Sequence, residues 1–328
     1  MESCCTAQNP QQVKLIFNPA AGVADESPFQ LMEIINELQS RKLIPETYLA
    51  QPDSDLLSVV QDALGRGIHM FIVCGGDGTI ESVAGALLNT PATLGIIPTG
   101  TRNNIALSLG IPEEISAAVA LLHTGRCIKI DVGLASCCNQ SRIFLETCSV
   151  GLLSALFPAA DDIQHGDLTR IGDFLATLIT SPSAEIRLVM DKQRKITTHA
   201  HAVLIANLPY VGPHYPIVPE GSFDDGLLDV LVFSDQSKLD LLSNVVQIAA
   251  GGPEDPRIQR YHAQKVDIET EPLMPVFTDG FSLGEGSLSI SVQQCALAVI
   301  SGLAANADKS DVSDVAALPA DPDVRIEV

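Results

Sequence analysis

The chain has no tryptophan, and aromatic residues make up only 4% of its 328 residues. It is also poor in positive charge: 19 Lys and Arg stand against 40 Asp and Glu, which gives a formal net charge of −21. Nucleic acids and anionic membranes are both bound through clustered Lys and Arg. The charge balance therefore excludes nucleic acid as an expected partner, and it predicts no tight electrostatic attachment to a membrane.

Long apolar runs and closely spaced cysteine motifs are missing as well. No stretch offers the ~20 apolar residues that a bilayer-spanning helix needs, and Met1–Gln12 lacks the basic start and apolar core of a secretory signal. The eight cysteines include the adjacent pairs Cys4–Cys5 and Cys137–Cys138, but no Cys-x-x-Cys spacing typical of metal sites. We expect a cytoplasmic protein with reduced thiols.

The first part of the chain alternates between strand-like and helix-like segments. Apolar runs of strand length are followed by segments in which apolar residues recur at helical spacing. This alternation predicts a parallel sheet covered by helices on both faces. The predicted strands are Val13–Phe17, Thr47–Ala50, His69–Cys74 and Thr93–Ile97, and the predicted helices are Phe29–Ser40, Asp53–Leu64 and Thr79–Asn89.

From about residue 134 the pattern changes to short alternating segments separated by turns such as Asp191-Lys192 and Asp225-Gly226. One helical stretch, Lys238–Ala250, interrupts them. This pattern predicts a mainly antiparallel second domain. The predicted division is 1–134, 135–304 and an acidic, mobile tail at 305–328. The predicted strands are Ile143–Cys148, Glu185–Met190, His199–Asn207, Leu227–Phe233, Lys265–Glu271 and Ser287–Val292.

The segment Gly75–Thr79 (Gly-Gly-Asp-Gly-Thr) stands between a predicted strand and a predicted helix. Its glycines allow the backbone to approach a ligand, and the helix start offers free N–H groups and a positive dipole end to an anion. Thr79 could cap the helix and donate to a phosphate oxygen, whereas Asp77 would repel phosphate unless a divalent cation intervenes. The segment predicts a phosphate loop; the alternative is a glycine-rich turn with Asp77 as a plain cap.

Two further polar, glycine-bearing loops follow predicted strands. Pro98–Asn104 comes after the next strand and leads into a helix, and Asn18-Pro19 with Gly22 ends the first strand. Because parallel strands place their carboxyl ends along one edge, the three loops should meet outside the sheet. They predict a nucleotide site, and the alternative is a set of unrelated surface turns.

These residues resemble the diacylglycerol kinase catalytic-domain family, which includes sphingosine and ceramide kinases and bacterial lipid kinases. The resemblance covers most of residues 13–300. The Gly-Gly-Asp-Gly-Thr motif is shared with NAD kinases and phosphofructokinases, and the other motifs favour the lipid-kinase branch. The matching pieces are FNPAAG at Phe17–Gly22, GGDGT at Gly75–Thr79, PTGTRNN at Pro98–Asn104 and SFDDGLLDV at Ser222–Val230.

The resemblance implies an N-terminal α/β domain similar to phosphofructokinase and a C-terminal antiparallel β-sandwich. It also implies ATP in the cleft between them and a structural Mg²⁺ held by Ser222, Asp225 and the carbonyl of Leu227. An ordinary hairpin turn is the alternative for this last segment. The nucleotide-binding residues expected from the resemblance and the loops are Asn18, Pro19, Gly75, Gly76, Asp77, Gly78, Thr79, Ile80, Glu81, Thr101 and Asn103.

Two positions depart from the family pattern. The loop that usually ends in Asp ends here in Asn104, and the usual Asp-Gly-Glu segment, whose Glu is regarded as the general base, ends in Phe281. Phenylalanine cannot accept a proton, and general-base help contributes about 10²- to 10⁴-fold. Asp279 or Glu285 could substitute as the catalytic carboxylate. The alternatives are a turn cap for Asp279 and a solvated turn residue for Glu285.

The leading hypothesis is a lipid kinase dependent on ATP and Mg²⁺, which transfers the γ-phosphoryl group to a hydroxyl of a diacylglycerol-like or sphingoid lipid. Such an enzyme would meet its substrate by peripheral contact at a membrane surface, and a homodimer is one assembly that the hypothesis allows. The second hypothesis is a nucleotide-binding pseudo-kinase, because Phe281 and Asn104 replace carboxylates. NAD kinase ranks third.

Overall fold

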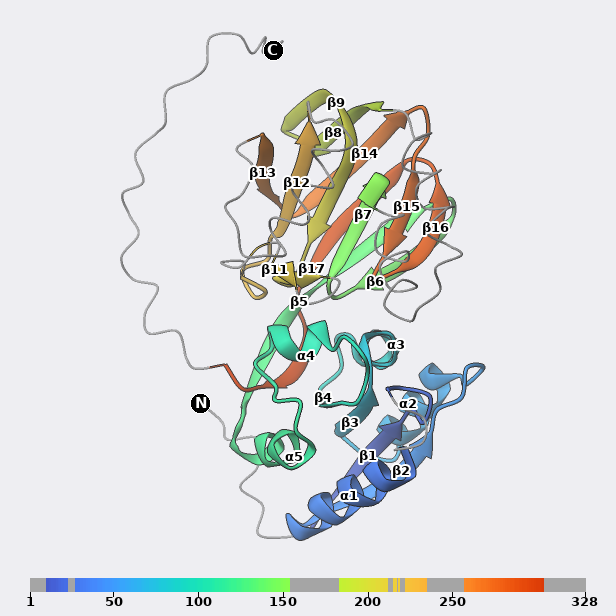
Figure 1. Ribbon diagram of the computed structural model, residues 1–328, viewed down its shortest axis with the longest axis vertical. Coiled ribbons are helices and arrows are strands. Elements are labelled where there is room, and N and C mark those ends of the chain that lie inside the picture. The colour runs from blue at the N-terminus through green and yellow to red at the C-terminus, as the bar shows by residue number, and fades with distance from the viewer. Residues whose placement is uncertain are drawn as a thin grey trace, which may run out of the picture.

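The computed structural model describes residues 10–22, 27–153, 183–211, 215–216, 218, 222–234 and 257–303. The predicted helix Lys238–Ala250 and the predicted tail 305–328 lie outside these ranges. The helices gather in one part of the molecule, and most of the strands form the other (Figure 1). The predicted combination of an α/β part and an antiparallel β part is confirmed.

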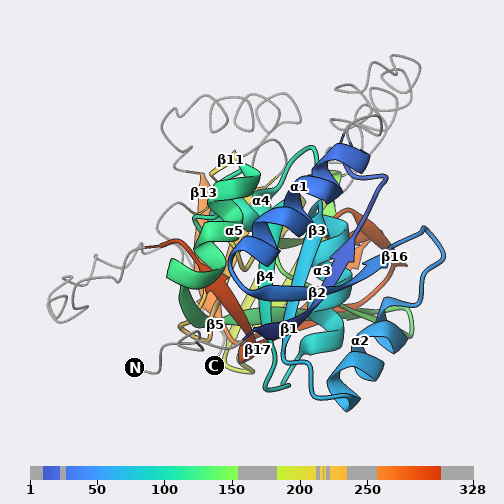
Figure 2. The same ribbon diagram turned by 90° about the horizontal axis from the view of Figure 1, so that it is seen from below.

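The N-terminal part is built on a parallel sheet in the order β4-β3-β1-β2. Helices α1 and α5 pack together on one face, and α2 and α3 pack together on the other (Figure 2). The strands are β1 (Gln11–Phe17), β2 (Leu43–Leu49), β3 (Met70–Gly75) and β4 (Thr93–Pro98), and the helices are α1 (Ser27–Ser40), α2 (Leu56–Gly65), α3 (Asp77–Leu87), α4 (Asn104–Ser108) and α5 (Ile115–Thr124).

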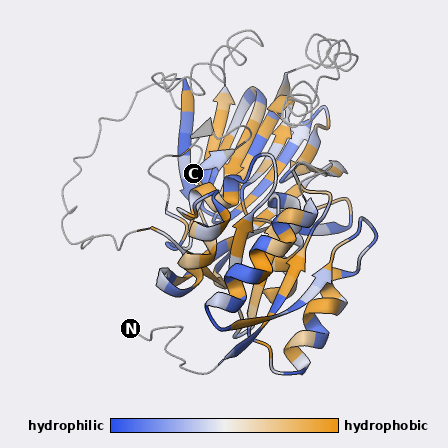
Figure 3. Ribbon diagram, turned by 60° about the horizontal axis from the view of Figure 1, so that its bottom comes forward, coloured by the Kyte–Doolittle hydropathy of each residue, from blue (hydrophilic) through white to orange (hydrophobic). Residues whose placement is uncertain are grey.

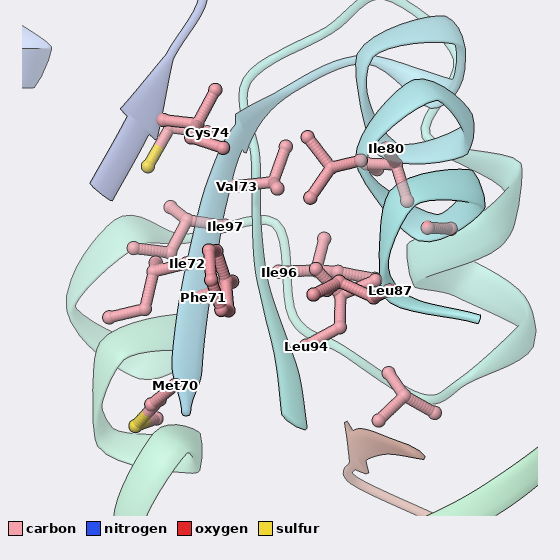
Figure 4. Packing of buried hydrophobic residues seen from close by; sticks show 14 of the residues in the cluster. Met70, Phe71, Ile72, Val73, Cys74, Ile80, Leu87, Leu94, Ile96 and Ile97 are labelled. Atoms are coloured by element: carbon pink, nitrogen blue, oxygen red, sulfur yellow. The ribbon is translucent and has the colours of Figure 1, made fainter. Parts of the chain in front are cut away.

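Apart from the buried Lys14 on β1, the centre of this sheet is apolar because helices cover both of its faces. All six residues of β3 are buried, and Figure 4 shows Ile80 of α3 facing Val73 on β3 and Leu87 of α3 beside Ile96 on β4. A buried parallel strand of this kind reads as a continuous hydrophobic run. The core therefore fixes where β3 ends, and with it where the following loop begins.

Two N-terminal elements differ from the sequence prediction. The second strand begins at Leu43 rather than Thr47, and Pro45 lies inside it. A proline is tolerated there because β2 is the edge strand of the sheet and needs fewer ladder hydrogen bonds. The second helix begins at Leu56 after the cap Asp55, three residues later than predicted, and Leu57 is 51% exposed.

The C-terminal part is antiparallel, with the strand order β16-β15-β7-β9-β8-β14-β17. Hydrophilic and hydrophobic residues alternate along many of these strands (Figure 3), as expected for a sheet with one buried face. The strands are β5 (Arg126–Cys137), β6 (Gln140–Phe144), β7 (Thr147–Gly151), β8 (Ala184–Met190), β9 (Arg194–Ala206), β10 (Tyr210–Val211), β11 (Tyr215–Pro216), β12 (Leu228–Ser234), β13 (Ile258–Ala263), β14 (Lys265–Glu271), β15 (Pro275–Thr278), β16 (Phe281–Glu285) and β17 (Leu288–Ser301).

The segment Ile143–Cys148 was predicted as one strand, and this prediction was wrong. The structure breaks it into β6 and β7 at Leu145-Glu146. The backbone N–H groups of both residues donate to the carboxylate of Asp279 instead of to a strand ladder. A side chain 133 residues further along the chain therefore interrupts the strand.

Strands β5 and β17 join the two parts of the molecule. They pair antiparallel over most of their length, and β17 ends by pairing parallel with β4, with Ala298 opposite Thr93. Leu134, the predicted domain boundary, lies inside β5. The predicted division into 1–134 and 135–304 stays a prediction, and all the described strands except β10 and β11 form one continuous 15-stranded sheet across it.

Candidate functional site

The three glycine-bearing loops meet at the carboxyl end of the parallel sheet. Asn18 Nδ2 donates to Thr79 Oγ1 at 2.8 Å, which ties the first loop to the second. A Cβ atom on Gly100 would collide with the backbone of Gly76, so the second and third loops touch backbone to backbone. At Gly22, a φ of +67° and the nearby carbonyl oxygen of the third loop leave no room for a side chain.

Helix α3 begins at Asp77, two residues earlier than predicted, and its N-cap is Gly76 in an extended conformation. The prediction that Thr79 caps this helix was therefore wrong, and Thr79 lies within the first turn. Since a glycine cap carries no side chain, no cap oxygen competes for the first N–H groups of the helix. An exposed Gly78 follows, so a phosphate can approach this helix end closely.

Asp77 caps a helix, but this helix is α4, which follows the neighbouring loop, and not α3. Its two carboxylate oxygens accept hydrogen bonds from the backbone N–H groups of Asn104 and Ile105, each at 3.1 Å. These residues open α4, so the carboxylate stabilises the start of that helix. Asp77 thereby fixes the second and third loops relative to each other, a role that its place in the sequence did not reveal.

The other predicted nucleotide residues fall into different environments. Asn103 has a left-handed φ of 52° and exchanges two hydrogen bonds with the backbone of Gly100, at 3.1 and 2.9 Å, so its buried amide shapes the loop. Thr101 is exposed at the loop tip, whereas Ile80 packs fully in the core. Ile80 can therefore support the loop but cannot present its side chain to a ligand.

Three carboxyl groups gather behind the loops: Glu81 on α3, Glu146 before β7 and Asp279 in the β15–β16 turn. Burial raises the pKa of Glu81 to about 8, with a further contribution from Asp279. Burial also raises the pKa of Glu146 well above its usual range, and Asp77 and Asp279 add to that shift. The charge of Asp279 therefore disfavours the ionised form of both glutamates.

Asp279 is enclosed by backbone amides. Its oxygens accept hydrogen bonds from the N–H groups of Leu145, Glu146 and Thr147 at 2.7 to 3.2 Å. Burial raises its pKa to about 6, and these amides act in the opposite direction by stabilising the charged form. Most of the accepting capacity of this carboxylate is therefore used to hold the junction between β6 and β7.

Phe281 lies over the predicted phosphate loop, at the position where the family pattern carries its Glu. A Cβ atom on Gly78 would be 4.0 Å from the ring, and the ring is stacked with Arg142 from β6. Arg142 Nε in turn donates to Glu81 Oε1 at 2.9 Å. Sequence reasoning missed Arg142. The only feature that could have drawn attention to it is that it is a basic residue in a chain with few of them.

Glu285, the other candidate base, lies at the opposite end of β16 from Phe281. Four residues of a strand span about 13 Å. Its side chain is exposed, and its carbonyl oxygen accepts a hydrogen bond from the thiol of Cys138 at 3.1 Å. The structure does not bring Glu285 to the phosphate loop.

The predicted Mg²⁺ turn, 222–227, is held by Asp131, a buried residue that sequence reasoning missed. The N–H groups of Gly226 and Cys295 donate to its carboxylate at 2.6 and 2.7 Å. Burial raises the pKa of Asp131, and the charges of Asp224 and Asp225 raise it further. Among the described residues, no three His, Cys, Asp or Glu side chains are grouped as a ready metal site.

A hard divalent cation nevertheless suits the chemistry of this turn. The predicted donors are a hydroxyl, a carboxylate and a carbonyl, all of them oxygen ligands. The exposed carboxylate of Asp225 accepts a hydrogen bond from the N–H of Leu227 at 3.0 Å, so the turn is already folded around it. A cation would also reduce the repulsion between the carboxylates that meet here.

Comparison with known proteins identifies the family. A model of the diacylglycerol kinase catalytic domain matches residues 12–135, and a model of the YegS C-terminal NAD kinase beta sandwich-like domain matches residues 161–301. The chain belongs to the diacylglycerol kinase catalytic-domain family. The predicted resemblance is confirmed, and so is the predicted C-terminal β-sandwich.

Related proteins from several bacteria support this assignment. A diacylglycerol kinase of Bacillus subtilis is 24% identical over 278 residues, which cover 82% of this chain and 89% of that one. An uncharacterized protein of Synechocystis is 29% identical over 293 residues, which cover 82% of this chain and 65% of that one. The crystal structure of a diacylglycerol kinase from Bacillus anthracis covers 90% of this chain and 99% of its own, with 25% identity and a TM-score of 0.72.

No helix in the described ranges is long and apolar enough to cross a membrane.

Proposed function

We propose that the protein transfers the γ-phosphoryl group of ATP to a hydroxyl of a diacylglycerol-like or sphingoid lipid, with Mg²⁺ as the cation. The observation that carries this proposal is the convergence of the three loops, tied by the Asn18–Thr79 hydrogen bond and by the contact between Gly76 and Gly100. A helix start without a side-chain cap, approached by small residues, suits a nucleotide phosphate. Family membership supports a kinase.

The chain's own residues would act mainly by positioning and charge. The first N–H groups of α3 bind phosphate oxygens, and Asn18 holds Thr79 in place beside them. Arg142 supplies a guanidinium at the mouth of the loop, where charge develops on the transferred group. Mg²⁺ that accompanies ATP would neutralise phosphate charge, and Ser222, Asp225 and the Leu227 carbonyl would hold a second Mg²⁺.

General-base help has a limited place in this proposal. Phe281 cannot take a proton, and Asp279 is committed to three backbone amides. Phosphoryl transfer depends chiefly on alignment and on electrostatic stabilisation. We therefore infer a slow enzyme that keeps the nucleotide chemistry of its family with little proton abstraction from the acceptor hydroxyl.

An acceptor screen tests this function. Purified protein with Mg²⁺ and γ-labelled ATP is offered diacylglycerol, a sphingoid base and NAD in parallel, with the lipids in mixed micelles. The expected result is a labelled phospholipid, and a Gly76→Val variant serves as the blank. Labelled NADP with no phospholipid would replace the proposal by NAD kinase.

The second candidate is a nucleotide-binding pseudo-kinase, which the Phe281–Arg142 stack favours because it fills the expected position of the base. It predicts that ATP binds while no acceptor is phosphorylated. Phe281→Glu separates the two candidates: a pseudo-kinase gains activity from the new carboxylate. Phosphorylation of a lipid acceptor by the wild type itself would rule out the pseudo-kinase.

A further inference from the structure

Asn104 and Glu146 form a buried pair at the junction of the two parts of the molecule. Asn104 Nδ2 donates to Glu146 Oε2 at 2.9 Å, and the residues are 2% and 7% exposed. Asn104 opens α4, whereas Glu146 directly precedes β7. The contact joins segments that are 42 residues apart in the sequence.

The identity of this pair accounts for one departure from the family pattern. That pattern places Asp where this chain has Asn104. An Asp there would face Glu146 at hydrogen-bond distance, and two carboxylates so close cannot both stay ionised. The chain instead has one amide and one carboxyl group, which form a complementary donor and acceptor. The contact thus keeps one carboxyl group, but Glu146 carries it instead of residue 104.

The pair also continues into the phosphate loop. Asn104 uses its side chain to contact Glu146 and its backbone N–H to donate to Asp77 Oδ2 at 3.1 Å. Glu146 is fixed at its own backbone as well, because its N–H donates to Asp279 and its carbonyl accepts from Asn207. A connected series of hydrogen bonds therefore runs from the β-sandwich through Asn104 to the residue that begins α3.

We propose that Glu146 is a positioning residue of the nucleotide site, supplying from the β-sandwich side the carboxyl group that the family pattern carries at the position of Asn104. Its carboxyl oxygen accepts the hydrogen bond that orients Asn104, and Asn104 in turn orients Asp77 and the loop that precedes α3. The inference rests on the proposed function, since the positioned group is the phosphate loop of a kinase. It assigns a role to a residue outside the sequence motifs.

A reciprocal exchange tests the pair. Four proteins are compared: wild type, Glu146→Gln, Asn104→Asp and the double variant, in which carboxylate and amide have traded places. Glu146→Gln keeps an oxygen acceptor for Asn104 but replaces the carboxyl group by an amide, so we expect kcat and the affinity for ATP each to fall about fivefold or more while the melting temperature changes little. Asn104→Asp should lower kcat by a similar factor, because it brings two carboxyl groups together.

The double variant decides the outcome. If the two residues act as a pair, the kcat of the double variant returns to within about threefold of wild type. Two independent losses cannot produce this result. Losses that multiply in the double variant would overturn the inference, and so would an unchanged kcat in Glu146→Gln. Glu269→Gln, on an exposed site of β14, controls for removal of an acidic charge elsewhere.

Nucleotide binding separates failure of this inference from failure of the proposed function. The Kd for ATP with Mg²⁺ can be compared among the same four proteins without any acceptor. We expect the double variant to regain the ATP affinity that each single variant loses. A wild type that binds ATP but phosphorylates nothing, with restoration in Kd, would remove the kinase proposal and keep the positioning role. A wild type that binds no nucleotide would overturn both.

Discussion

The guanidinium carbon of Arg142 lies 3.7 Å from the centroid of the Phe281 ring. Phe281 is 43% exposed and borders Gly78, so the stack stands at the open side of the predicted phosphate loop. With Nε bonded to Glu81 and one face on the ring, the guanidinium is held from two directions. Phe281 has therefore a physical role of its own at a position where a carboxylate was expected.

Removing the Phe281 ring should release Arg142. A cation–π contact of this kind contributes about 0.5 to 2 kcal/mol, which corresponds to a factor of about 2 to 30. We expect Phe281→Ala to lower kcat within that range, whereas Phe281→Tyr, which keeps the ring, should stay close to wild type. Steady-state kinetics with saturating ATP measures both. Equal activity in all three proteins would show that the stack does not serve turnover.

The backbone contact between the second and third loops should be sensitive to a single methyl group. Gly100→Ala places a Cβ atom against Gly76, so the loops must separate. We expect the affinity for ATP with Mg²⁺ to fall about tenfold or more, measured by titration calorimetry. Gly65→Ala, at the end of α2 with nothing within 4 Å of the new atom, is the matched control and should bind ATP like wild type.

The Asn18–Thr79 hydrogen bond should couple the first two loops energetically. Asn18→Ala and Thr79→Val each remove one partner, and a net hydrogen bond contributes about 0.5 to 1.5 kcal/mol. Each variant should therefore weaken ATP binding, while the double variant should be little worse than either single one. A double-mutant cycle on the Kd for ATP measures the coupling. Fully additive losses would mean that the two side chains act separately.

Stability should depend on pH through Glu81. Burial raises its pKa from 4.5 to about 8 in the folded protein, so between these values the folded state binds more protons than the unfolded state. Its contribution to stability is complete below pH 4.5 and is lost as the pH rises towards 8. Glu81→Gln stays neutral, so its melting temperature relative to wild type should rise from pH 5 to pH 8.

The exposed Glu33→Gln on α1 controls for the loss of an acidic side chain, and its difference from wild type should not vary in this way with pH. A Glu81→Gln protein whose melting temperature follows wild type in parallel across this pH range would show that Glu81 is ionised throughout.

The loops could be predicted from the sequence because their chemistry is local. A strand, a run of glycines and a helix start lie within a few residues, and the positions of Gly22 and Gly100 tolerate no side chain. The order of parallel strands then brought the loops to one edge. The fold class followed from the change in segment pattern near residue 134.

The rest depends on contacts between distant segments. Arg142 reaches Glu81 across 61 residues, and Asp131 holds the N–H of Gly226 across 95. Glu146 appeared to lie within a regular strand, and only the three-dimensional structure shows that Asp279 takes up the backbone of that segment. The one available signal was that Glu146 is the only charged residue in the predicted strand Ile143–Cys148. That signal did not reveal which residue it contacts.

The most direct test of the account is to measure ADP and phosphorylated lipid in the same reaction, with wild-type protein, ATP, Mg²⁺ and diacylglycerol or a sphingoid base in mixed micelles. The account predicts equal amounts of the two products, formed slowly by wild type and much more slowly by Gly100→Ala. ADP released without phosphorylated lipid, or no ADP at all despite bound ATP, would contradict phosphoryl transfer to a lipid hydroxyl at this site.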